Sequence, residues 1–261
     1  MGKIKAAFFD IDWTLYDHGC HAFTPSALEA IKELKEKGIK VFLCTARPYQ
    51  SLVDLGTNDL GIKWDGFVSS NGGVAYADGI FLRKTLMKQK TLVKFSSLCK
   101  SLKLTFEFVS PFEREMAFSP NAYVQKLFSV YSETTPKVRR YHGQDVIGLL
   151  LFAPKCYDSI IKSHFPKLIY HRFSDYGVDV MEESHEKGDG VPLLLNHFGI
   201  KKEEAIGFGD DIQDISMANS VGQFVAMGQG KEELKAVASF VTARIEDDGV
   251  LKGLRHYGLL S

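Results

Sequence analysis

Residues 4–15 read IKAAFFDIDWTL, an almost continuous apolar run that ends in two aspartates, Asp10 and Asp12. An apolar run of this kind is typical of a parallel strand that is buried on both faces. The two carboxylates follow at the carboxyl end of the strand, which is where open α/β sheets bind their ligands. Their spacing also points both side chains to the same side. The stretch therefore predicts an α/β fold with a polar site after its first strand.

Two carboxylates so close together repel each other unless a cation or a shared proton intervenes. Asp10 and Asp12 thus indicate a metal site or a proton-sharing pair, while a solvated loop with two unrelated acids explains the residues equally well. The pair alone does not decide between these interpretations.

The residues that follow predict a βαβ unit and hence a parallel sheet. A helix is expected to begin at Pro25 and to end at Gly38, and a second apolar run occupies residues 39–43. A third strand is expected at residues 66–70, and Asp78-Gly79 predicts a hairpin turn after it.

The pattern changes between residues 84 and 183, where helices and strands alternate as in a small α+β module. The βα rhythm returns from Gly188 onward. We therefore expect a Rossmann-like parallel-sheet core made of residues 1–83 and 184–261, with residues 84–183 inserted as a second, α+β domain.

The composition excludes several classes of function. Among 261 residues, 32 basic side chains balance 32 acidic ones, so no overall field attracts nucleic acid or an anionic membrane. No apolar run approaches the roughly 18 residues that a membrane span needs. The four cysteines are scattered without a CxxC pair, which argues against a zinc ribbon and a disulfide framework. We expect a cytoplasmic protein that meets any anionic substrate through local contacts.

Four short motifs resemble, in chain order, those of the haloacid dehalogenase (HAD) superfamily. The stretch DIDWT at residues 10–14 resembles the first motif, DxDxT; Thr45 matches the hydroxyl motif, Lys187 the lysine motif, and GDDIQD at residues 209–214 the acidic motif. Further stretches resemble the Cof-type branch: TARP at 45–48, NGG at 71–73, AMG at 226–228 and EDDGV at 246–250. Members of this branch carry an α/β cap between the second and third motifs, so residues 84–183 would be the cap.

The resemblance implies a magnesium-dependent phosphatase that forms an aspartyl-phosphate. It makes Asp10 the nucleophile and Asp12 the acid that protonates the leaving group and later the base that deprotonates water. It has Asp210, the Asp10 carboxylate and the Asp12 backbone carbonyl bind Mg²⁺, with Asp214 as an auxiliary ligand. The residues that it places at the substrate are Thr45, Ala46, Arg47, Asn71 and Lys187, of which Thr45 and Lys187 hold the phosphoryl oxygens.

Several of these residues have structural alternatives. Thr45 could be an ordinary hydroxyl at a strand end, Lys187 a solvated lysine, Asn71 a turn residue, and Arg47 a partner in a surface salt bridge. His185, which is close to two glutamates, is expected to be solvated.

Three positions depart from the family pattern. Trp13 replaces a common glycine beside the nucleophile, Gln213 stands where asparagine is usual, and Ala46 replaces another glycine. None of these changes removes a group that performs chemistry. We expect a monomer or homodimer that hydrolyses a small phosphorylated metabolite, in particular a sugar phosphate. The alternatives are a phosphomutase acting on a sugar phosphate and a magnesium-binding regulator with reduced catalysis.

Overall fold

The computed structural model describes residues 3–131 and 134–261, which form two compact units. Unit 1 consists of Met1–Arg47, Asn58–Arg83 and His185–Ser261, and unit 2 of Pro48–Thr57 and Lys84–Ser184. These bounds place residues 48–57 with the insertion, whereas the sequence analysis placed them with the core. Contacts of Asp54 with Arg114 (3.1 Å) and Thr134 (2.7 Å) account for part of this association.

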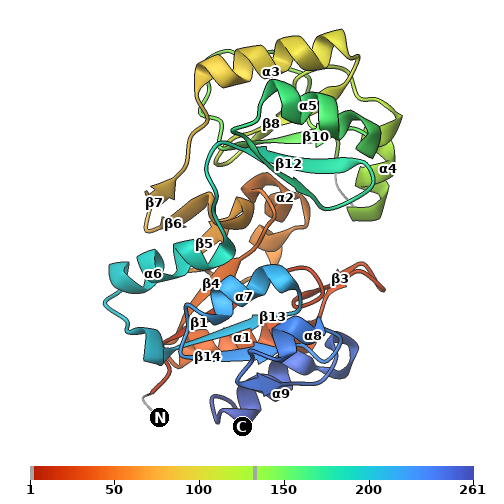
Figure 1. Cartoon of the computed structure of the whole chain (residues 1–261). Helices are drawn as coiled ribbons and strands as arrows, with labels where there is room; N and C mark the ends of the chain where they lie inside the picture. Colours follow the sequence, from red (N-terminus) through yellow and green to blue (C-terminus); the bar gives the residue numbers. More distant parts are fainter. Residues whose placement is uncertain (1–2, 132–133) are drawn as a thin grey trace. The chain divides into compact units, whose positions relative to one another are not determined.

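Unit 1 is built on one eight-stranded sheet (Figure 1). Its strands follow the order β15 (Phe240–Val241), β14 (Gln223–Ala226), β13 (Ala205–Gly209), β1 (Ala6–Phe9), β4 (Lys40–Cys44), β5 (Gly66–Ser69), β6 (Val74–Ala77) and β7 (Ile80–Lys84). The strands from β15 to β5 pair in parallel, and β6 pairs antiparallel with β5. Because β1 lies between β13 and β4, the carboxyl ends of these three strands are neighbours.

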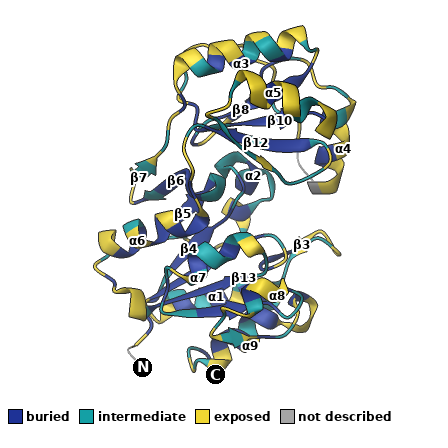
Figure 2. Cartoon of the chain, viewed as in Figure 1, coloured by how far each residue is buried: buried dark blue, intermediate teal, exposed yellow. Residues whose placement is uncertain are grey.

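Helices cover both faces of this sheet, as the Rossmann-like prediction requires. Helices α1 (Pro25–Glu36) and α9 (Gly249–His256) contact each other, and α6 (Lys187–His197) contacts α7 (Ile215–Ala218). Neighbouring residues of β1 point to the two opposite layers. Phe8 belongs to the core cluster that includes Leu194 of α6. Phe9 stacks on Phe208, with ring centroids 5.2 Å apart, on the side of α9. Figure 2 shows the central strands in the colour of buried residues.

The predicted βαβ unit is confirmed as β1, α1 and β4, and the Asp78-Gly79 turn joins β6 to β7 with φ values of 47° and 82°. Two features differ from the prediction. A short hairpin of β2 (Tyr16–Asp17) and β3 (Ala22–Phe23) follows β1. The helix expected after residue 49 is broken into α2 (Tyr49–Asp54) and the 3₁₀ turn η1 (Thr57–Asp59), because Gly56 adopts φ 79°.

Unit 2 contains a five-stranded sheet of antiparallel pairs. The order is β11 (Ile169–Arg172), β12 (Gly177–Met181), β10 (Gly148–Phe152), β8 (Thr105–Val109) and β9 (Arg114–Met116). Its helices are α2, α3 (Gln89–Ser101), α4 (Ala122–Tyr131) and α5 (Asp158–His164). A separate core fills this unit, with Phe95 and Phe106 in edge-to-face contact at 5.2 Å. The fold is therefore the predicted α/β core with an additional α+β unit.

The remaining helical segments are short. They are α8 (Glu232–Lys235) and the 3₁₀ turns η2 (Ser70–Gly72), η3 (Lys155–Tyr157), η4 (Lys202–Glu204), η5 (Ile212–Asp214) and η6 (Ile245–Asp247). Within residues 3–131 and 134–261, no helix has both the length and the apolar character that crossing a bilayer requires.

Candidate active site

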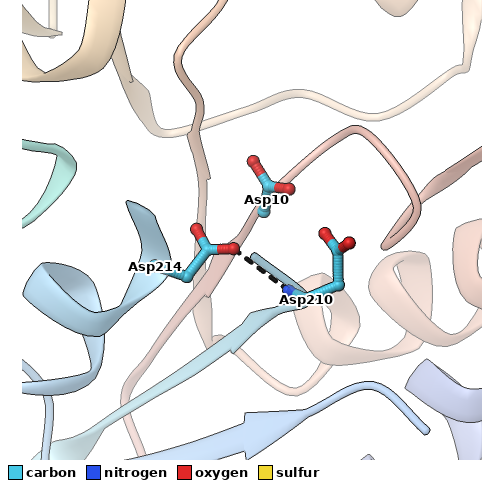
Figure 3. A group of neighbouring side chains, drawn as sticks. All are labelled: Asp10, Asp210 and Asp214. Atoms are coloured by element: carbon cyan, nitrogen blue, oxygen red, sulfur yellow. Dashed lines mark hydrogen bonds between the residues drawn. The ribbon is translucent and has the colours of Figure 1, made fainter. Parts of the chain in front are cut away.

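The predicted acidic residues meet at the carboxyl edge of the sheet in unit 1. Asp10 follows β1, Asp210 follows the neighbouring β13, and Asp214 lies one turn later in η5. Figure 3 shows these three side chains grouped together. Each offers a carboxylate oxygen, and these oxygens all lie within 4.8 Å of one another. Oxygen donors in this number suit a hard divalent cation such as Mg²⁺.

Lys187, at the first position of α6, projects its ammonium group into this cluster. Its Nζ lies 2.6 Å from Asp10 Oδ1 and 2.8 Å from Asp214 Oδ1, and all three side chains are buried. Burial alone would lower the pKa of Lys187, but the charges of Asp10 and Asp214 outweigh it and raise the pKa well above its usual value. The residue is therefore a buried ammonium, not a solvated lysine.

The carboxylates of the cluster carry more negative charge than one ammonium balances. Burial, followed by the charge of Asp214, raises the pKa of Asp10 well above its usual value, although Lys187 opposes this effect. The same two causes, in the same order, raise the pKa of Asp210 to about 8. A divalent cation would relieve this repulsion, so the donor set and the charge both fit the metal that the family pattern implies.

Asp214 acts as an anchor for the acidic loop. One oxygen binds Lys187, and the other accepts the backbone N–H groups of Asp210 (3.0 Å, Figure 3) and Asp211 (3.1 Å). Gly209 leaves room for this carboxylate, since a Cβ atom there would lie 2.5 Å from Asp214 Cγ. Both oxygens of Asp214 are thus engaged by the protein, which suits an auxiliary ligand better than a primary one.

Tight packing at the start of α6 directs Lys187. Glu186 and Asp189 form a capping box around the first turn. Gly188 donates its N–H to Ser216 Oγ at 3.0 Å, and a Cβ on Gly188 would lie 2.1 Å from the Ser216 carbonyl oxygen. Only glycine at position 188 permits this close approach of α6 to α7. The approach fixes the position of Lys187, which precedes Gly188.

The Asp12 carboxylate is not one of the three clustered carboxylates and is held by two cationic or donor side chains. Arg47 donates to it through Nε (2.8 Å to Oδ2) and Nη2 (2.7 Å to Oδ1), and His18 Nε2 lies 2.6 Å from Oδ1. Burial would raise the pKa of Asp12, but the hydrogen bonds from His18 and Arg47 outweigh it and hold the pKa well below its usual value. Arg47 is itself buried, so the ion pair is not a surface salt bridge. The backbone carbonyl remains as the metal ligand that the family pattern assigns to Asp12.

The predicted substrate residues other than Lys187 occupy two segments that are joined by hydrogen bonds. Thr45 is buried after β4, and its Oγ1 accepts the N–H of Arg47 at 3.1 Å, with the partly exposed Ala46 between them. Asn71 in η2 donates its N–H to the Thr45 carbonyl at 3.3 Å and adopts the left-handed φ of 52°. Its Oδ1 is buried and has no hydrogen-bond partner among the described residues. Asn71 thus serves the turn and also offers an acceptor at the site.

His185 is a residue of this region that the sequence analysis missed. It is buried, with 6% exposure, and its Nδ1 lies 3.0 Å from the carbonyl oxygen of Asn71. The expectation of a solvated histidine was wrong because the chain returns here from unit 2 and packs against η2. Gly73 makes room for the ring, since a Cβ there would lie 3.1 Å from it, but a glycine in the sequence does not by itself indicate this contact.

Trp13 explains why glycine is common at its position. Its backbone φ is 58°, in the left-handed region, which costs a bulky residue about 1–2 kcal/mol. The side chain is 42% exposed. Gln213, another of the three unusual positions, is partly exposed, and its backbone carbonyl accepts a hydrogen bond from the Ser216 hydroxyl at 3.1 Å.

This site and fold define a hydrolase of the HAD type. The family model described as haloacid dehalogenase-like hydrolase matches residues 7–254, and the chain belongs to this family.

Several of the similar proteins are named as phosphatases. YkrA of Bacillus subtilis (strain 168), which is named as a phosphatase, is 28% identical over 263 residues that cover 98% of each chain. The solved structure of a hypothetical protein from Geobacillus kaustophilus HTA426 has a TM-score of 0.90 at 27% identity and covers 98% of this chain and all of its own. The HAD subclass IIB sugar phosphatase BT4131 has a TM-score of 0.79 at 30% identity, with the same coverage. The chain is therefore a phosphoric monoester hydrolase of this family.

Proposed function

We propose that the protein is a magnesium-dependent phosphatase of small organic phosphate monoesters, in particular sugar phosphates, and that it works through an aspartyl-phosphate on Asp10. One observation carries the proposal. The Asp10 carboxylate lies at the end of β1 beside an ammonium at 2.6 Å and in a cluster of acids that calls for a cation. The similarity to a sugar phosphatase supports the substrate class.

In this proposal an oxygen of Asp10 attacks phosphorus while the bond from phosphorus to the leaving alkoxide breaks. Asp12 gives the alkoxide a proton, then takes one from the water that releases phosphate and restores Asp10. Thr45, Lys187 and the backbone of Ala46 hold the phosphoryl oxygens. Asp10, Asp210 and the Asp12 carbonyl would hold Mg²⁺, with Asp214 behind them, and the ion would screen the attacking carboxylate from the phosphate charge.

Arg47 has a double role in this scheme. The hydrogen bonds from His18 and Arg47 keep Asp12 ionised, which is the form needed to deprotonate water and not the form needed to protonate the leaving group. We propose that an anionic substrate competes for Arg47 and, by its own charge, favours protonation of Asp12. Asn71 would contact the substrate from η2, and residues 84–183 would decide which esters are accepted.

The test is phosphate release by the wild type and by Asp10→Asn, measured with Mg²⁺ and with EDTA. We expect Asp10→Asn to reduce release to background while circular dichroism stays unchanged, and EDTA to inactivate the wild type. Asp211→Asn is the matched control, because it makes the same chemical change outside the cluster. Release by Asp10→Asn at the wild-type rate would exclude Asp10 as the nucleophile.

The substrate class is tested by the same assay over sugar phosphates, nucleotides, flavin mononucleotide and pyridoxal phosphate. Release that is fastest on the sugar phosphates would support the proposed class. Faster release from nucleotides or from either cofactor phosphate would contradict it.

A further inference from the structure

His18 lies at the end of the β2 strand with its ring enclosed on two sides by aromatic side chains. The Trp13 ring is 5.3 Å away by centroids, tilted at 47°, and the Tyr16 ring is 5.0 Å away, edge-on at 72°. The His18 side chain is only 11% exposed, and its Nε2 lies 2.6 Å from Asp12 Oδ1. The imidazole is thus fixed in one orientation, with a nitrogen directed at the carboxylate of Asp12.

The contact with His18 explains why position 13 is a tryptophan. Its backbone is fixed by a hydrogen bond from its N–H to the Tyr16 carbonyl at 2.9 Å and by the Gln229 side chain, which donates to its carbonyl. These backbone contacts would form equally well with glycine, which adopts φ 58° without strain. What tryptophan adds, and glycine cannot, is the ring that packs on His18. A strained conformation that persists at a functional site indicates a role for the side chain.

The two partners of Asp12 hold it differently. Arg47 donates to both carboxylate oxygens, while His18 contacts Oδ1 alone. If the substrate competes for Arg47, as proposed above, then the contact from His18 is the one that continues to fix the rotation of the carboxylate. A group that delivers a proton must be held in place, since a misplacement of about 1 Å can cost about a hundredfold in rate.

We propose that His18, held by Trp13, is a positioning residue for Asp12 in the proton transfer to the leaving group. The inference rests on the proposed function, because it assumes that Asp12 acts as the acid. It assigns a role to two residues that the HAD motifs do not include: His18 aligns the acid, and Trp13 aligns His18.

The test compares two probes of nearly equal shape, phenyl phosphate and p-nitrophenyl phosphate, since the nitro group makes the leaving group much better and reduces the need for an acid. We expect His18→Ala to lower kcat/KM on phenyl phosphate by about tenfold or more and on p-nitrophenyl phosphate by less than about threefold. His18→Gln, whose amide reaches as far as Nε2, should restore most of the loss. Trp13→Gly should show the same preference for the better leaving group, and Trp13→Phe should behave like the wild type.

A merely structural role of His18 predicts that His18→Ala loses activity equally on both probes, and that result would overturn the inference. A His18→Gln variant that folds and is as impaired as His18→Ala would also overturn it. Asp12→Asn separates the inference from the proposed function. The comparison uses kcat/KM, which reports only the step in which the leaving group departs and not the later hydrolysis that both probes share. If Asp12→Asn lowers kcat/KM equally on both probes, then Asp12 is not the acid and that part of the proposed function fails. If Asp12→Asn lowers kcat/KM less on p-nitrophenyl phosphate and His18→Ala changes neither probe, then only the role of His18 is excluded.

Discussion

Replacing Asp210 with asparagine is expected to make the metal-free protein more stable while abolishing its activity. The pKa of Asp210 rises from the ordinary value of 3.8 to about 8, because the carboxyl is buried beside Asp214. At about 1.36 kcal/mol per pKa unit, such a rise corresponds to at most about 5–6 kcal/mol of lost stability at high pH. Asp210 is partly exposed and screened by solvent, so we expect a gain of about 2–4 kcal/mol for Asp210→Asn at pH 8.

The sign of the pH dependence follows from proton linkage. The folded state binds the Asp210 proton more tightly than the unfolded state does, so the stability of the wild type falls as the pH rises from about 4 to about 8. The asparagine of the variant would not titrate, and the difference between the two proteins should therefore be near zero at pH 4 and largest at pH 8. Mg²⁺ should reverse the order: at about 1,000 times its Kd, an ion stabilises the wild type by about 4.1 kcal/mol, and the variant has lost a ligand.

The assay is urea unfolding at pH 5 and pH 8, each with EDTA and with Mg²⁺. Asp211→Asn serves as the control, because Asp211 is in the same loop and its side chain caps η5, which asparagine can also do. Its charge raises the pKa of Asp210 less than burial and Asp214 do. We expect the control to change stability by less than about 0.5 kcal/mol. An Asp210→Asn protein that is less stable than the wild type in EDTA at pH 8, or whose gain is equal at both pH values, would refute the electrostatic reasoning.

Three further substitutions test other parts of the site. Lys187→Met should cost about 3–5 kcal/mol in EDTA by urea unfolding, since it leaves buried carboxylates without their ammonium, and the loss should shrink as the pH falls. Gly209→Ala should cost about 1–3 kcal/mol, because its Cβ would lie 2.5 Å from Asp214 Cγ, whereas Gly148→Ala, with its nearest neighbour at 3.5 Å, should be nearly neutral. Arg47→Lys should lower kcat/KM for phosphate release about tenfold, because a single ammonium cannot replace the two-point contact of the guanidinium; unchanged kcat/KM would exclude a role for that geometry.

The sequence predicted the elements whose signal is local. The apolar run that ends at Asp10 is a central strand, and its side chains are buried because helices cover both faces of the sheet. The Asp78-Gly79 pair forms the turn that its residues favour. The parallel order of the strands follows from the βαβ rhythm. These features depend on residues close together in the chain, and periodicity and turn chemistry report them directly.

The features that the sequence did not predict depend on contacts between distant segments. Each of the hairpin strands β2 and β3 has two residues, too few for an alternating pattern to be visible. The charged neighbours of His185 in the sequence predicted a solvated side chain. The residue is nevertheless buried, and its hydrogen-bond partner Asn71 lies 114 positions earlier in the chain. Arg47 was ambiguous for the same reason, since its partner Asp12 lies 35 positions earlier.

The two aspartates of the first motif have opposite electrostatic environments in the protein without ligands, and each is the reverse of what the first step of the proposed reaction requires. The pKa of Asp10 is raised, although a nucleophile must be ionised, and the pKa of Asp12 is lowered, although an acid must carry a proton. A cation beside Asp10 would lower the first, and a phosphate dianion that draws Arg47 away from Asp12 would raise the second. The residues then reach their working protonation states only when metal and substrate are both bound. On this reasoning, neither aspartate has the protonation state that the first step needs in the free enzyme. A variant that binds Mg²⁺ but cannot release Arg47 from Asp12 should therefore bind phosphate esters without cleaving those with poor leaving groups.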